Sequence, residues 1–149
     1  MIVKINELPN SLEVLGARAF TRCKNIVITK LPPKLKVLPS FCLSQAPLVN
    51  ISQFGSNVPG EGLTTIEGGA LFESGSMVNR IELLKSVYKL ATDKAGSSTN
   101  ATYAAFENYG ILNSSTEVVL YRGKGSYVDE NEVVIPEDSF DFFVGFTAG

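Results

Sequence analysis

Few side chains in this chain are suited to catalysis. Its 149 residues include no His, which is the commonest general base and the commonest metal ligand, and only two Cys, Cys23 and Cys42. Ser-His-Asp hydrolysis, Cys-His nucleophiles and His-bearing zinc sites are therefore excluded. Two Cys also cannot form a Cys₄ zinc site.

Carboxylates are the remaining candidates for chemistry, and six of them follow Lys124, where no further basic residue occurs: Asp129, Glu130, Glu132, Glu137, Asp138 and Asp141. A calcium site or a carboxylate pair for glycoside hydrolysis could be built from such residues. The spacing fits neither an EF-hand loop nor a recognisable glycosidase pair. A run of charges usually faces water, so we expect a solvated acidic end with no catalytic residue, no metal and no cofactor. A carbohydrate-modifying enzyme that uses Asp138 remains an alternative.

The composition narrows the partners further. Thirteen basic side chains stand against fifteen acidic ones, for a net charge of -2. A sequence-independent nucleic-acid binder would normally carry a basic excess, so no nucleic-acid partner is expected. Apolar stretches are too short to span a bilayer, and the N-terminal residues lack the apolar core of a signal peptide. We expect no membrane insertion and favour a cytoplasmic or virion-associated protein, with the compartment left open.

Apolar residues recur with a period of 23, which points to an array of repeated units. One recurring apolar position, that of Leu8, Leu31 and Phe54, is followed directly by a turn residue in each unit: Pro9, Pro32 and Gly55. Two further pairs are Val14 with Val37 and Leu15 with Leu38. The four main columns are Val3, Ile26 and Val49; Ile5, Ile28 and Ile51; Leu8, Leu31 and Phe54; and Leu12, Leu35 and Val58.

The repeats continue after a Gly-rich insertion at 55–62. There Ile66 corresponds to Leu15 and Leu38, while Ala70 and Leu71 correspond to the pairs Ala19 with Cys42 and Phe20 with Leu43. A second insertion covers 91–102. We expect one domain over 1–149, with regular repeats at 1–54, insertion-bearing repeats at 55–125 and a capping unit at 126–149.

The segment from Leu8 to Cys23, LPNSLEVLGARAFTRC, resembles the BspA-type leucine-rich repeat family at nearly every marked position. The resemblance extends well over 1–90 and loosely over 103–136. It departs from the family pattern at Ser74 and at Ala46, where Cys is expected. The resemblance implies that Cys23 is a small buried hydrophobe, and it implies a surface that contacts another macromolecule.

The expected fold is an α/β repeat solenoid, a leucine-rich-repeat-like stack of short parallel strands with convex turns or short helices. Alternate residues of each strand point into a shared core, so the others form an open sheet face. This polar, mostly uncharged face is the predicted protein-binding surface, and its residues are Lys4, Asn6, Val27, Thr29, Asn50, Ser52, Arg80, Glu82, Val119 and Tyr121.

Charge is distributed unevenly along the chain. Residues 1–50 carry seven basic and two acidic side chains, whereas 125–149 carry only acids. The sequence thus predicts a non-catalytic protein-binding module, whose partner is another protein or its own copies in head-to-tail contact. The alternative is a structural subunit of a larger assembly, such as a phage virion or tail component. The cluster from Phe140 to Phe146 is then a cap on the last unit or a docking patch.

Overall fold

The computed structural model describes residues 5–6, 8–75, 80–91, 105–106, 117–123, 125–129 and 131–135. Eight short strands run through these segments, and no helix occurs among them. The strands are β1 (Ile5–Asn6), β2 (Ile26–Val27), β3 (Val37–Leu38), β4 (Gln53–Phe54), β5 (Thr65–Ile66), β6 (Arg80–Leu83), β7 (Lys89–Leu90) and β8 (Glu117–Leu120).

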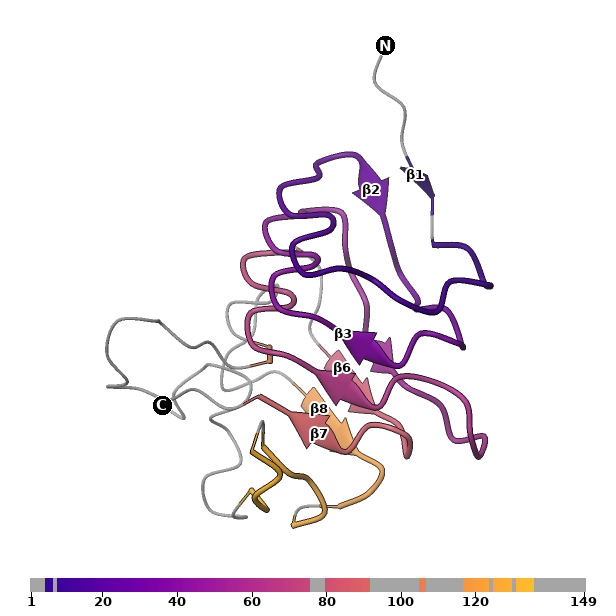
Figure 1. The fold of residues 1–149 in the computed structure, drawn as a ribbon, viewed down its shortest axis with the longest axis vertical. Helices are drawn as coiled ribbons and strands as arrows, with labels where there is room; N and C mark the ends of the chain where they lie inside the picture. The colour runs from indigo at the N-terminus through magenta and orange to yellow at the C-terminus, as the bar shows by residue number, and fades with distance from the viewer. Residues whose placement is uncertain are drawn as a thin grey trace, which may run out of the picture.

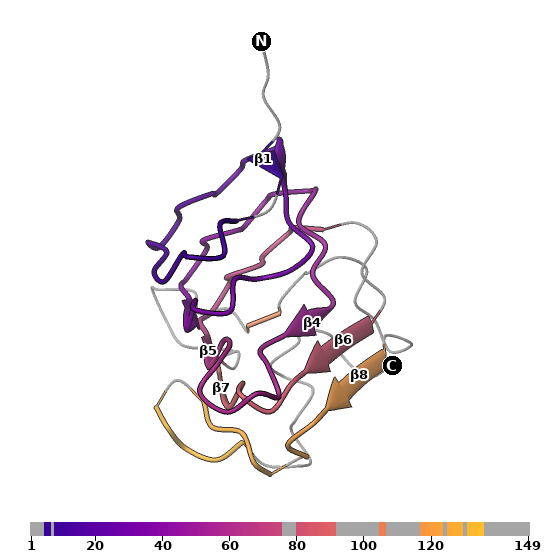
Figure 2. The ribbon, with the colours of Figure 1, turned by 90° about the vertical axis from the view of Figure 1, so that its right-hand side faces the viewer.

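Every pair of these strands is parallel, and the pairs form three small sheets (Figures 1 and 2). β1 pairs with β2, the second sheet has the order β3-β5-β7, and the third has the order β4-β6-β8. After β2 the chain alternates between the second and the third sheet. Consecutive strands from β3 onward therefore lie in different sheets. The prediction of short parallel strands is therefore confirmed. The helical half of the expected α/β class is not: among the described residues, turns make the connections.

Strand register departs from the expected columns at the N-terminal end. Ile26 pairs with Ile5 rather than with Val3, and Ile28 bridges to Val49 rather than to Ile51. A slip of two residues keeps each side chain on the same face of a strand, so Ile26, Ile28, Val49 and Ile51 are all buried. Further along the chain, Leu38 pairs with Ile66 as the repeat predicts.

Three turns stack on one another beside the strands, and they are called the first turn (residues 16–23), the second turn (39–46) and the third turn (67–74). The N–H groups of Arg18, Phe20 and Arg22 in the first turn donate to the carbonyl oxygens of Ser40, Cys42 and Ser44 in the second. In the same way, the N–H groups of Leu43 and Gln45 donate to the carbonyl oxygens of Ala70 and Phe72 in the third turn. Phe20, Leu43 and Leu71, which the repeat places at equivalent positions, thus lie in successive stacked turns.

Each turn bends through two residues with positive φ, four positions apart. These residues are Arg18 and Arg22, Phe41 and Gln45, and Gly69 and Glu73. A non-glycine residue in this region costs roughly 1–2 kcal/mol, so packing between turns must hold the conformation. One such contact is the guanidinium of Arg18, which lies 4.8 Å from the centre of the Phe41 ring.

A row of polar side chains crosses the outside of the three turns. Arg22 Nε donates to Gln45 Oε1 at 2.8 Å, and Gln45 Nε2 donates to Glu73 Oε1 at 3.0 Å. The amide between the cation and the anion is therefore fixed in one orientation.

The core lies between the strands and the stacked turns. Its side chains are aliphatic or aromatic, and Phe54 meets Phe106 edge to face with ring centroids 5.0 Å apart. Cys42 is fully buried, but Cys23 is only half-buried, so the expectation that Cys23 is buried holds only in part. Both thiols are free.

The insertion at 55–62 folds back on the preceding strand region. Gly62 N donates to the carbonyl oxygen of Pro33, and Lys36 Nζ donates to that of Gly60 at 2.7 Å. Gly62 has a φ of 88°, and a Cβ there would lie 2.7 Å from the backbone nitrogen of Ser56. Only glycine can make this close approach.

Several expectations fall outside the described residues. They include the position of Lys4, the insertion after Ala91, the carboxylate of Asp138 and the aromatic cluster from Phe140 to Phe146. Within the described part of the chain, no helix is long and apolar enough to cross a membrane.

Candidate binding surface

The outward face of the β4-β6-β8 sheet is built by alternation along its strands. In β6, Ile81 and Leu83 are buried while Arg80 and Glu82 are partly exposed. The parallel register then sets Gln53 beside Glu82, and Glu82 beside Val119. Three adjacent strands thereby bring polar side chains from distant parts of the sequence onto one surface.

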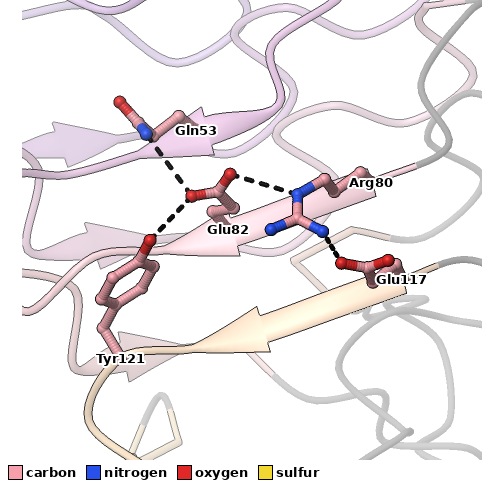
Figure 3. Close-up of polar contacts among 5 residues, drawn as sticks. All are labelled: Gln53, Arg80, Glu82, Glu117 and Tyr121. Atoms are coloured by element: carbon pink, nitrogen blue, oxygen red, sulfur yellow. Dashed lines mark hydrogen bonds and ion pairs between the residues drawn. The ribbon is translucent and has the colours of Figure 1, made fainter.

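Glu82 is the centre of this surface (Figure 3). Its Oε1 accepts hydrogen bonds from Tyr121 Oη at 3.0 Å and from Gln53 Nε2 at 3.5 Å, and its Oε2 accepts one from Arg80 Nε at 3.2 Å. The hydrogen bond from Tyr121, and next that from Arg80, hold the pKa of Glu82 below its usual range. The carboxylate in turn raises the pKa of Tyr121. At neutral pH, Glu82 is therefore an anion and Tyr121 a neutral donor.

Arg80 joins two carboxylates on neighbouring strands. One side of its guanidinium contacts Glu82, and Nη1 contacts Glu117, its register partner in β8. The side chains of Arg80 and Glu117 are 43% and 61% exposed, so solvent screens the pair, and such pairs contribute about 0–1 kcal/mol to stability. The main effect of the contacts is to restrict these side chains to one arrangement.

An open cleft of about 460 Å³ adjoins the network. Its polar side comes from the sheet face and includes Ser52, Gln53 and Glu82. Further lining residues belong to the segment between β2 and β3, and they include Thr29, Lys30, Leu31 and Pro32. The cleft thus combines the carboxylate of Glu82, hydrogen-bonding groups and the cation Lys30 with apolar side chains such as Leu31, an arrangement suited to a protruding side chain of a partner.

The structure unites only part of the predicted face. Arg80, Glu82 and Tyr121 meet in the network, and Val119 lies beside them, half-buried, in β8. Thr29 and Ser52 are exposed and line the cleft, whereas Asn50 is half-buried. Val27, also half-buried, and the backbone of Asn6 belong to the separate β1-β2 pair, and Lys4 falls outside the described residues.

Two members of the network, Gln53 and Glu117, are missing from the predicted face. Glu117 lies two residues before Val119, so the same alternation includes it. Gln53 follows Ser52, and both are exposed because the buried Ile51 and Phe54 are three positions apart. Strict alternation could not find Gln53, because the strand departs from it there.

No protein-family model matches this chain, and neither does any curated protein or solved structure among those compared with it.

Proposed function

We propose that this chain is a non-catalytic protein-binding module whose partner contacts the outward face of β4, β6 and β8 and the adjoining cleft. The observation that carries the proposal is the hydrogen-bonded network around Glu82. Polar side chains on three strands are held in one arrangement on an accessible surface, although they contribute little to stability. Side chains ordered before binding lose less entropy when a partner docks.

The proposal includes a repeat architecture. Parallel strand pairing in three sheets and the stacked turns support a stack of repeated units. The resemblance of the segment from Leu8 to Cys23 to BspA-type repeats is the reason for proposing a leucine-rich-repeat-like solenoid of that type. In such an array each unit buries its face against its neighbours, which leaves the outer sheet face free for a partner.

Site-specific photocrosslinking tests the proposed surface. A benzoylphenylalanine probe replaces Ser52 at the cleft in one variant, and Lys34, which is exposed but does not line the cleft, in a matched control. We expect one defined adduct with a protein from the source cells for the Ser52 probe alone, and its loss when Glu82→Lys is added. Equal adducts from both probes, or an adduct that survives Glu82→Lys, would contradict the proposed surface.

A structural subunit of a larger assembly, such as a virion or tail component, is the second candidate. The observation that favours it is the exposure of apolar side chains at the N-terminal end, where Val14 is 79% exposed. If copies of this chain stay bound to purified virions or tails after a high-salt wash, and the probe at Ser52 gives no adduct, this candidate is supported over the first.

A further inference from the structure

The N-terminal end of the stacked turns leaves apolar side chains partly uncovered. Leu35, Leu38 and Leu43 are fully buried, but their counterparts in the preceding unit are only half-buried. Val14 is 79% exposed, against 37% for its counterpart Val37. The half-buried counterparts are Leu12, Leu15 and Phe20.

The same end presents a row of backbone acceptors. In the second turn the carbonyl oxygens of Ser40, Cys42 and Ser44 accept N–H groups from the first turn. The equivalent carbonyl groups of the first turn belong to Ala17, Ala19 and Thr21. Within the described part of the chain, no backbone N–H reaches any of these three. A polypeptide that offers N–H groups at alternate residues would continue the ladder by one more row.

Charge indicates the composition of that polypeptide. Residues 8–25 contain three basic side chains, Arg18, Arg22 and Lys24, all exposed, and one acidic side chain, Glu13. An incoming segment with acidic residues would be attracted to the end of the stack. Apolar residues alternating with them would cover Val14 and Phe20.

We propose that the N-terminal end of the stacked turns binds an extended segment of a partner protein in which apolar and acidic residues alternate. The segment donates its N–H groups to Ala17, Ala19 and Thr21, sets its apolar side chains on Leu12, Leu15 and Phe20, and directs its carboxylates toward the basic rim. This surface is separate from the face around Glu82, so either can fail without the other.

Synthetic peptides test the site on the full chain. The probe is a fluorescent eight-residue peptide of alternating Val and Glu, blocked at both ends, and binding is followed by fluorescence anisotropy. A Val-Lys peptide tests the charge, and a Val-Glu peptide N-methylated at alternate residues removes the donors. We expect binding of the Val-Glu peptide, with at least tenfold weaker binding of both controls. Absence of Val-Glu binding, or equal binding of the N-methylated peptide, would overturn the proposal.

Variants locate the binding on the chain. Ala19→Glu sets a carboxylate at an exposed position of the first turn, and we expect it to weaken peptide binding at least tenfold. Thr29→Glu adds the same charge at the cleft and should leave peptide binding unchanged. Val14→Glu repeats the test if Ala19→Glu lowers the urea midpoint of unfolding. Equal effects of Ala19→Glu and Thr29→Glu would overturn the location, and concentration-dependent self-association abolished by Ala19→Glu would identify a second copy as the occupant instead.

Discussion

The first and second turns have similar sequence patterns but different surroundings. Phe20 and Leu43 occupy equivalent positions, yet Leu43 is fully buried while Phe20 is half-buried. The second turn has a hydrogen-bonded neighbour on each side, and the first has one only on the side of the second turn within the described residues. The comparison teaches that burial in this chain is a property of the position in the stack, and that the residue pattern alone does not determine it.

The two thiols give the largest expected contrast between these turns. Burial raises the pKa of Cys42 to about 12, so at pH 8 only about one thiol in ten thousand would be ionised, and the thiolate is the reactive form. Cys23, in the first turn, is half-buried. We expect iodoacetamide to label Cys23 at least about 100-fold faster than Cys42, measured by mass spectrometry of the native protein.

Single-thiol variants assign the two labelling rates. Cys42→Ala should retain the fast phase, and Cys23→Ser should leave only the slow phase, which becomes fast in urea. Labelling of both thiols at one rate in the native protein would show that the first two turns open together.

Truncation of equivalent side chains measures the energetic difference between the turns. Leu43→Ala should lower the free energy of unfolding by about 2–5 kcal/mol, because it removes a fully buried side chain and leaves a cavity. Phe20→Ala should cost only about 1–2 kcal/mol, since roughly half of the burial of a large side chain is lost and water can fill the space. Urea denaturation gives both values, and a larger loss for Phe20→Ala would contradict the exposed state of the first turn.

The third turn differs from the first two in having glycine at its first positive-φ position. A Cβ at Gly69 would lie 2.8 Å from the Phe41 ring, whereas a Cβ at Gly60, also with positive φ, would meet no atom within 4 Å. Both Gly→Ala variants cost the backbone strain of roughly 1–2 kcal/mol, and Gly69→Ala adds a clash of about 1–3 kcal/mol. Equal unfolding midpoints for the two variants would show that the Phe41 ring moves freely and that the turns are loosely stacked.

The smallest expected effect concerns Glu82 on the sheet face. Tyr121→Phe removes the largest cause of its lowered pKa, so the pKa of Glu82 should move up toward the ordinary value. Because the folded state lowers this pKa, the associated stabilisation is present above the pKa of the unfolded state and is lost as the pH falls through the folded-state pKa. Carboxyl-carbon NMR titration measures the shift. An unchanged pKa would show that Tyr121 does not hold the carboxylate in solution.

The sequence predicted those features that repeated apolar residues determine. Short parallel strands, the inward positions of Ile28, Ile81 and Leu83, and the partnership of Leu38 with Ile66 follow from alternation and the period. The network was predicted in part, since Arg80, Glu82 and Tyr121 are all outward residues of the expected strands. Their mutual contacts depend on register between strands that an insertion separates.

Other features had no signal in the residue pattern. Strand register at Ile5 and Ile28 differs by two positions from the period, and an apolar residue fits the inward face in either register. The apolar columns of the first unit correspond to those of the second, with Val14 opposite Val37, so they give no indication that Val14 is more exposed than its counterpart. Gln53 occurs where two consecutive residues face outward, which strict alternation cannot anticipate.

The row formed by Arg22, Gln45 and Glu73 sets a positive charge on the first turn and a negative charge on the third. The side-chain oxygen Oε1 of Gln45 faces the cation Arg22 and its amino group Nε2 faces the anion Glu73, so the dipole of the amide opposes, and partly offsets, the separation of charge along the stack. An exchange of the two charged residues, Arg22→Glu with Glu73→Arg, would leave the net charge unchanged but would require the amide to turn by half a rotation. The order of the two charges along the stacked turns thus determines the orientation of the uncharged Gln45 amide between them.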